Sequence, residues 1–215
     1  MRPFILIVFL VLAACTGNPV VESTPDSLGM YSVKSVPFDR FLIKSASVLQ
    51  DYSAITASPI NVDNVEIDEE RLEFDEKPWI LTEKDRARLQ RIFASSFRQV
   101  FESKRSFSAE AQDGKGTLNL EVELLEFTPN APKDDFKSRE INEKIITYNV
   151  GDITLKAIIT DASTGEVIAI VEDDEEIGDD RLQINDRVTN TRETRLTFQS
   201  WLSRLNNALV KLRSS

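Results

Sequence analysis

Three segments in the second half of the chain carry the alternation of a β-strand. In residues 118–124, leucine and valine at the even positions alternate with asparagine and glutamate. Residues 153–160 repeat this alternation, and residues 167–171 follow as a further apolar stretch. A period of two places one side of an extended chain in the core and the other side in solvent. We therefore predict strands at these segments, with a hairpin turn at residues 161–166, where Gly165 supplies the positive φ.

Two other segments repeat apolar residues at intervals of three and four, as amphipathic helices do. The first follows Thr82, and its leucine, isoleucine, valine and phenylalanine side chains form one face. Thr82 and Asp85 have the spacing of a capping box, which marks the start of this helix. The second helix is expected at about residues 190–213, with Asn190 and Glu193 as its cap and capping partner.

A weaker alternation in residues 41–48 predicts one further strand. Residues 51–78 are polar and acid-rich, and residues 129–144 form a polar insertion, so we interpret both as surface connections. Together the elements predict an α+β fold, in which a mixed, largely antiparallel sheet of about four strands packs against two amphipathic helices. Because this length suits one core, residues 38–215 are predicted to form a single periplasmic domain.

The N-terminal segment resembles the signal peptide of a bacterial lipoprotein. Arg2 precedes an unbroken apolar run over residues 4–12, which is much shorter than the roughly 20 residues that span a bilayer as a helix. The run ends in Leu-Ala-Ala-Cys, which looks like a lipobox, in which cleavage follows Ala14 and the sulfur of Cys15 receives diacylglycerol. We therefore predict a lipoprotein signal peptide at residues 1–14 and lipidation at Cys15. The alternative is a plain secretory signal with an incidental cysteine.

Acylation would anchor the mature chain without spanning the membrane, because two or three acyl chains on one residue hold a protein far more firmly than one. In the lipoproteins that this pattern resembles, a residue other than aspartate after the cysteine, here Thr16, implies transfer to the outer membrane. We therefore expect a lipid-anchored protein of the cell envelope, in the outer membrane and facing the periplasm. Residues 15–37 contain prolines, glycines and serines, which predict a flexible tether after the lipidated cysteine, with a short ordered piece at residues 28–33 as the alternative.

The composition excludes several enzyme chemistries. The 215 residues include no histidine and one cysteine, which rules out a Ser-His-Asp triad, an imidazole base and a clustered thiolate metal site. With 36 acidic and 26 basic residues the formal net charge is −10, which does not suit nucleic acid. The sequence contains no phosphate-binding glycine loop. We predict that the protein is not an enzyme and has no catalytic residue, no cofactor and no metal site.

Two charged segments could either be solvated surface or bind ions. The acids of residues 172–180 are interpreted as a solvated strand end that leads into a loop, because their contiguous spacing is not that of a calcium-binding loop. Weak binding of divalent ions is the alternative. The first helix carries four arginines mostly off its apolar face, namely Arg86, Arg88, Arg91 and Arg98. We interpret them as a solvated helix surface, with anion binding as the alternative.

Two motifs carry a resemblance to a bacterial family. Residues 151–169 read GDITLKAIITDASTGEVIA, a strand-turn-strand segment, and residues 198–202 read FQSWL. Together with the order of elements, these motifs look like the proteobacterial lipoproteins grouped as domain of unknown function 3313. The resemblance covers most of the mature chain, and it implies the fold and an envelope location. Because that family has no assigned activity, the resemblance implies no reaction and transfers no catalytic residue.

Two classes of function are compatible with these features. The primary prediction is a non-enzymatic envelope module that presents a sheet edge or a helix face to a protein partner, in an assembly or export system. The alternative is a binder of a small apolar ligand or lipid, lodged between sheet and helices. A deep apolar cavity would favour the ligand binder, whereas an unpaired strand edge or a shallow apolar surface would favour the interaction module.

Overall fold

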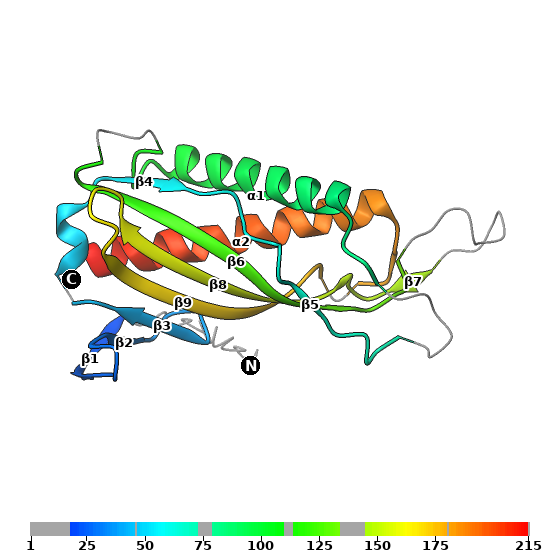
Figure 1. Ribbon diagram of the computed structural model, residues 1–215, viewed down its shortest axis with the longest axis horizontal. Helices are drawn as coiled ribbons and strands as arrows, with labels where there is room; N and C mark the ends of the chain where they lie inside the picture. Colours follow the sequence, from blue (N-terminus) through cyan, green and yellow to red (C-terminus); the bar gives the residue numbers. More distant parts are fainter. Residues whose placement is uncertain are drawn as a thin grey trace, which may run out of the picture.

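The computed structural model has two layers, a long twisted sheet and two helices that lie side by side on one of its faces (Figure 1). This arrangement confirms the predicted α+β fold with its helix pair. The structure describes residues 18–45, 47–72, 79–109, 114–133, 145–179 and 181–214. In these segments no helix combines the length and the hydropathy that crossing a membrane requires.

The main sheet has eight strands, more than the about four predicted. Their order across the sheet is β1-β2-β3-β9-β8-β6-β4, and β5 pairs with a further stretch of β6. Because β4 and β5 run parallel to β6 while the other pairs in this order are antiparallel, the sheet is mixed and largely antiparallel, as predicted. The strands are β1 (Val20–Pro25), β2 (Tyr31–Lys34), β3 (Arg40–Ile43), β4 (Ala54–Ala57), β5 (Glu66–Ile67), β6 (Thr117–Pro129), β8 (Gly151–Asp161) and β9 (Val167–Glu176). A separate short ladder joins β7 (Ile146–Thr147) to β10 (Gln183–Ile184).

The middle of the sheet consists of the three segments whose alternation predicted strands. β6, β8 and β9 are antiparallel neighbours, with Leu120 opposite Ile159 and Ala157 opposite Val171. Along most of β8 every second side chain is buried, and the intervening ones are partly exposed. Gly165 has a φ of +74° between β8 and β9, which confirms the predicted hairpin and the role of glycine in its turn.

Strands also form where a tether was predicted. Within residues 15–37, β1 pairs with β2 and β2 pairs with β3, so the prediction of a flexible tether is wrong for residues 20–34. The side chain of Val33 is buried in the core. The carboxylate of Asp26 accepts hydrogen bonds from two N–H groups of the turn between β1 and β2. Ordered structure therefore starts near Val20 and not at residue 38.

Residues 51–78, predicted as a surface connection, also contribute to the sheet and the core. β4 and β5 both pair with β6, and the side chains of Ile55 and Ile60 are fully buried. Prolines and polar residues interrupt the short apolar stretches here, so the sequence shows no regular alternation of apolar residues from which these strands could be predicted. The strand predicted over residues 41–48 is shorter than expected, because β3 ends at Ile43 and the helical turn η1 (Val48–Asp51) follows.

Helix α1 (Glu83–Lys104) begins where its capping pattern predicted. The hydroxyl of Thr82 accepts a hydrogen bond from the N–H of Asp85, and the Asp85 carboxylate accepts one from the N–H of Thr82. This reciprocal pair is the predicted capping box. On the buried face of the helix, the ring of Phe93 meets Phe198 of α2 edge to face, with 5.5 Å between the ring centroids.

Helix α2 (Arg187–Arg213) begins earlier than predicted. Its N-cap is Asp186, whose carboxylate accepts hydrogen bonds from the N–H groups of Val188 and Thr189. The predicted cap pair, Asn190 and Glu193, lies inside the helix and does not cap it. Asp186 has the extended backbone that an N-cap requires, with φ of −131° and ψ of 167°.

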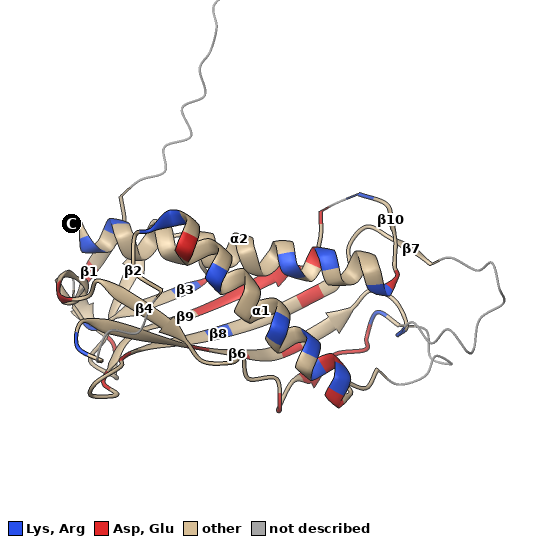
Figure 2. Cartoon of the chain, turned by 90° about the horizontal axis from the view of Figure 1, so that it is seen from above, with Lys and Arg blue, Asp and Glu red and all other residues tan. Residues whose placement is uncertain are grey.

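Both helices begin at the same end of the molecule, where β6 ends and β8 begins (Figure 2). Their other ends lie near η1, at the opposite end of the long axis (Figure 1). The first turns of α1 and α2 therefore come together over one end of the sheet. This convergence forms the candidate site.

Candidate functional site

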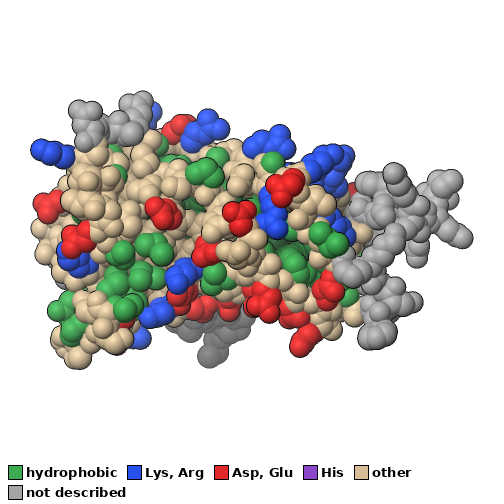
Figure 3. Space-filling view, viewed as in Figure 1, with side chains coloured by type: hydrophobic (Ala, Val, Ile, Leu, Met, Phe, Trp, Pro, Cys, Tyr) green, Lys and Arg blue, Asp and Glu red, His purple; other side chains and the backbone are tan. Residues whose placement is uncertain are grey.

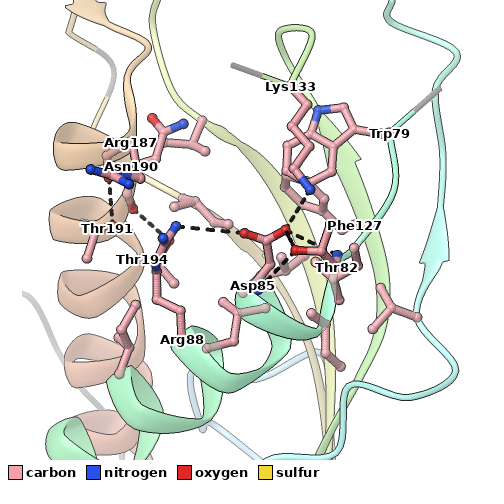
Figure 4. Close-up of a pocket in the computed structure, with 18 of the residues that line it drawn as sticks. Trp79, Thr82, Asp85, Arg88, Phe127, Lys133, Arg187, Asn190, Thr191 and Thr194 are labelled. Atoms are coloured by element: carbon pink, nitrogen blue, oxygen red, sulfur yellow. Dashed lines mark hydrogen bonds and ion pairs between the residues drawn. The ribbon is translucent and has the colours of Figure 1, made fainter. Parts of the chain in front are cut away.

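A cavity of about 350 Å³ lies between the first turns of the two helices and the end of the sheet (Figure 4). Its volume falls at the lower end of the range of about 300 to 1,000 Å³ that is typical of small-molecule pockets. Residues from many separate parts of the chain line it, including the segment before α1, α1, β6, Lys133 after β6, the start of β8, Ile177 after β9, and α2. The cavity is therefore a product of tertiary packing.

Most of the cavity wall is apolar. Helix α1 contributes Leu89 and Ile92, and the sheet contributes mainly aliphatic side chains and Phe127. The indole of Trp79 stands edge to face against Phe127 with 5.0 Å between centroids, and its Nε1 donates a hydrogen bond to the carbonyl oxygen of Ala131. The indole is thereby fixed in orientation at the cavity wall. The remaining apolar lining residues are Val65, Leu81, Leu124, Val150, Ile153 and Ile177.

One side of the cavity carries a row of charged groups from α1 and the segment after β6 (Figure 4). Asp85 lies in the centre of this row. Its Oδ2 accepts a hydrogen bond from Lys133 Nζ at 2.6 Å and one from Thr82 Oγ1 at 2.5 Å, and its Oδ1 is 3.8 Å from Arg88 Nη1. Lys133 Nζ also lies 5.1 Å from the centre of the Trp79 ring. The three charged side chains are only partly exposed, at 22% for Asp85, 26% for Arg88 and 30% for Lys133.

The contacts of Asp85 decide its protonation state. Burial by itself would raise the pKa of this carboxyl, but the hydrogen bonds from Lys133 and Thr82 outweigh burial and hold the pKa below its ordinary value. Asp85 is therefore ionised at neutral pH. Since Lys133 and Thr82 already occupy one of its oxygens, Asp85 is a fixed part of the wall and has no proton to donate.

Helix α2 lines the opposite side of the cavity with polar residues. The hydroxyl of Thr191 donates to the carbonyl oxygen of Arg187 at 2.6 Å, and that of Thr194 donates to the carbonyl oxygen of Asn190 at 2.7 Å. Asn190 Nδ2 donates to Asn185 Oδ1 at 2.9 Å. These donors are thus engaged with oxygens of α2 or of Asn185 just before it. Arg187 is different, because within the described segments its exposed side chain has no hydrogen bond or ion pair.

The cavity is electropositive in an acidic protein. Four basic side chains and one acidic side chain line it, so its formal charge is +4 − 1 = +3, whereas the whole chain carries −10. The basic residues are Lys84, Arg88, Lys133 and Arg187. Figure 3 shows that basic side chains also gather over α1 on the upper edge of the molecule, with many acidic ones lower, over the sheet. The uneven charge distribution indicates where an anion would be attracted.

The residues predicted for lipidation and cleavage, Cys15 and Ala14, lie outside the described residues, as does Thr16. Their roles stay predictions. The polar insertion over residues 129–144 is described only as far as residue 133, which is the lysine that contacts Asp85.

The acidic segment differs from its prediction. Residues 172–176 belong to β9, and the alternation of the strand turns Asp173 toward α2, where its side chain is buried. Asp173 accepts hydrogen bonds from Arg204 Nη2 at 3.3 Å and from the N–H of Asp39 at 3.1 Å. The interpretation as a solvated strand end is therefore wrong for Asp173. In the described segments no three acidic or cysteine side chains come close enough together to hold a metal ion.

A ligand site between sheet and helices was the alternative function, but its position was not predicted, although Thr82, Asp85, Arg88 and Asn190 were named for other roles. Arg88 was interpreted as part of a solvated surface, but it turns into the cavity beside Asp85. A signal for this position exists in the sequence. Asp85, Arg88 and Ile92 follow one another at intervals of three and four, so they share one side of α1 with the apolar face.

Comparisons with known proteins identify a family and distant likenesses of fold. A family model described as protein of unknown function (DUF3313) matches residues 43–205. A search of curated proteins gives no match. Three similar solved structures have 9–12% sequence identity and indicate no function for this chain.

Three of the similar structures come from different bacteria. A protein from Xanthomonas campestris has 12% identity and a TM-score of 0.43, with 87% of this chain and 90% of that chain covered. The PelC dodecamer from Paraburkholderia phytofirmans has 10% identity and a TM-score of 0.38, with 74% and 91% covered. A putative neuraminyllactose-binding hemagglutinin homolog from Helicobacter pylori has 9% identity and a TM-score of 0.32, with 72% and 82% covered.

Proposed function

The chain belongs to this DUF3313 family of proteins of unknown function, and we propose that it is an envelope-anchored protein that binds a small, largely apolar ligand in the cavity. The observation that carries the proposal is the cavity of about 350 Å³ between sheet and helices, whose lining is mostly apolar. Water in such a space makes few hydrogen bonds with the walls, so an apolar ligand that displaces it gains free energy. Ligand binding between sheet and helices is the class of function that an apolar cavity favours.

The polar groups of the cavity support a binding protein over an enzyme. Asp85 is the acid that lines the cavity; its lowered pKa makes it a poor general acid and a weak base, and Lys133 and Thr82 occupy its Oδ2. The hydroxyls of Thr191 and Thr194 donate to helix carbonyls and have no base beside them that would activate them as nucleophiles in the described part of the chain. The proposed role is therefore uptake of a ligand without chemical change.

The location in the proposal rests on the N-terminal residues. The lipobox pattern ends in Cys15, the single cysteine of the chain, and Thr16 follows it. Lipidation there supports an outer-membrane protein that faces the periplasm. A ligand binder with this location would meet small amphipathic molecules of the envelope.

The binding proposal can be tested with the neutral fluorescent dye Nile red. We expect saturable binding to the full chain, at one site, with the blue-shifted emission of an apolar environment. The substitution Leu89→Trp adds bulk to the cavity wall and should weaken binding by about tenfold or more, because overpacking and lost space together cost roughly 1–3 kcal/mol.

A matched control uses the same substitution on the other helix. Leu196 is 45% exposed on α2 and does not line the cavity, so Leu196→Trp should leave dye binding unchanged. Circular dichroism would confirm that both variants fold. Absence of saturable binding, or equal affinities for the two variants, would contradict the proposal.

A second candidate is the protein-interaction module, which one observation favours. β1 is the terminal strand of the sheet, and nearly all of its residues are exposed, so its outer edge could pair with an extended segment of a partner. A photocrosslinking residue at Thr24 in β1 would test this in the native envelope. A single adduct from Thr24, absent from a control position at Arg195, would support the module, and the same adducts from both positions would contradict it.

A further inference from the structure

We infer that the ligand is anionic at its polar end, so that a carboxylate or phosphate group on an apolar chain is held by Arg88 and Arg187. The inference rests on the proposed function and specifies the class of ligand. It begins from the charge of the cavity, which is +3 in a chain of −10. A ligand with an apolar body alone would leave Arg187 without a partner among the described residues and Arg88 with only its long contact to Asp85.

The contacts around Asp85 show which cations are available to a ligand. Lys133 is committed to the wall, because its Nζ contacts Asp85 Oδ2 at 2.6 Å and also the carbonyl oxygen of Ile80. Arg88 has a looser contact, at 3.8 Å from Asp85 Oδ1, which is beyond hydrogen-bond distance. A guanidinium has five N–H donors, so Arg88 keeps donors for a carboxylate or phosphate.

Arg187 provides the second cation from the other helix. It is the first residue of α2, and within the described segments its side chain contacts no acid. Arg88 and Arg187 therefore line one cavity from two helices, and most of the other lining side chains are apolar. This is the arrangement that an amphipathic anion needs, with an apolar chain in the depth and its charged group beside the arginines.

The starts of the two helices add to the positive potential. Each helix N-terminus carries a partial positive charge that falls off within the first turn. Thr82, Asp85 and Arg187 are cap or first-turn residues, so both first turns border the cavity. The carboxylate of Asp186 already accepts hydrogen bonds from the N–H groups of Val188 and Thr189. The start of α2 can therefore attract an anion through its electrostatic potential, but these two N–H groups are not free to bind it.

The same groups disfavour a cationic ligand. An ammonium group in the cavity would meet Lys84, Arg88, Lys133 and Arg187, while the acid that lines it, Asp85, is already paired. Arg88 and Lys133 are less than one third exposed, so their repulsion is less screened than that of fully solvated charges. The binding affinity should therefore be highest for anionic head groups, lower for neutral ones and lowest for cationic ones.

The test compares ligands with one alkyl chain and different heads, each below its micelle concentration and at neutral pH. The probes are decanoate, decyl phosphate, decanol and decyltrimethylammonium, titrated calorimetrically into the full chain. We expect the anionic probes to bind about tenfold or more tightly than decanol, since a hydrogen bond to a charged group contributes enough for such a factor. If decyl phosphate binds more tightly than decanoate, the natural ligand carries a phosphate head. If decanoate binds more tightly, it carries a carboxylate.

Two variants on α1 test whether Arg88 is responsible for the tighter binding of anionic probes. Arg88→Gln should reduce decanoate affinity about tenfold while decanol affinity stays the same, because the apolar walls are intact. Arg98→Gln makes the same change of charge on the same helix at an exposed position outside this cavity, and should alter neither affinity. Circular dichroism would verify the fold of both.

The outcomes separate the inference from the proposed function. If decanol and decanoate bind equally well, the anionic head is wrong although the apolar binding site stands. If Arg88→Gln and Arg98→Gln weaken decanoate equally, the preference reflects net charge, and the assignment to Arg88 is wrong. If no alkyl probe binds, the proposed function itself fails.

Discussion

At the scale of single residues, Arg204 joins parts of the fold that are distant in sequence. From α2, its guanidinium donates to Asp173 in β9 at 3.3 Å and to the carbonyl oxygen of Pro37 at 3.1 Å, and it also pairs with Glu175. Its Cζ atom lies 5.5 Å from the centre of the Phe38 ring. Arg204 therefore holds the helix layer, the middle of the sheet and the segment before β3 together.

Asp173 should make the stability of the protein depend on pH. Burial raises the pKa of its carboxyl to about 6, and the opposing effects of Arg204 and the N–H of Asp39 do not cancel this. Because the folded state binds the proton more tightly than the unfolded chain, the stabilisation is fully present below the ordinary pKa of about 4 and is lost as the pH rises through about 6. Asp173→Asn removes this dependence.

The measurement is urea unfolding of the wild type and the variant at a series of pH values between about 4 and 7. The free energy of unfolding of the wild type, relative to Asp173→Asn, should fall as the pH rises across this range. The exposed neighbour Asp174 serves as the control, because Asp174→Asn should keep the pH dependence of the wild type. A variant of Asp173 that follows the wild type at every pH would show that this carboxyl is not responsible.

At the scale of elements, the start of α2 depends on Asp186. Its carboxylate accepts hydrogen bonds from the N–H groups of Thr189 and Val188, and these bonds lower its pKa. We expect Asp186→Ala to lower the free energy of unfolding by about 1 kcal/mol at neutral pH. Since the pKa is lowered in the folded state, the contribution is present above the ordinary pKa and is lost as the pH falls through the lowered value.

Chemical denaturation at neutral and acidic pH measures the effect of the cap. Arg195 is exposed on the same helix, so Arg195→Ala should change the free energy of unfolding by no more than about 0.5 kcal/mol. Equal effects of the two substitutions would contradict the assignment of Asp186 as the cap.

At the scale of the whole molecule, strand β1 and the cavity lie at opposite ends. Cys15 precedes Val20 by five positions, so even an extended chain would keep the lipid within about 18 Å of the start of β1. The cavity lies where the helices begin, at the far end of the long axis (Figure 1). With the domain standing on its anchor, the cavity would face away from the membrane that holds it.

The anchor itself gives a direct prediction. Cys15→Ser should abolish incorporation of radiolabelled palmitate and leave an unprocessed or soluble precursor, because a hydroxyl cannot form the thioether. Fractionation of the envelope measures the second effect. Unchanged membrane partition together with unchanged palmitate labelling would exclude lipidation at this position.

The sequence by itself determined the elements whose signals are local. The alternation in β6 and β8, the glycine of the hairpin turn and the Thr82–Asp85 capping box each lie within a few residues, so the pattern alone located them. The α+β class followed from the order of these elements. The strand β1, by contrast, has a mostly exposed burial pattern and depends on pairing with β2, so no apolar period marked it.

Tertiary structure decided what depends on distant partners. Asp173 looks like a solvated acid in the sequence, and it is buried because β9 continues past residue 171 and α2 places Arg204 over it. The cavity likewise takes its walls from segments between Val65 and Thr194, and Arg88 becomes one of its residues only when α2 packs beside α1. The physical reason is that hydrophobic periodicity reports burial along one element, whereas a cavity and a buried ion pair are set by the packing of several elements against one another.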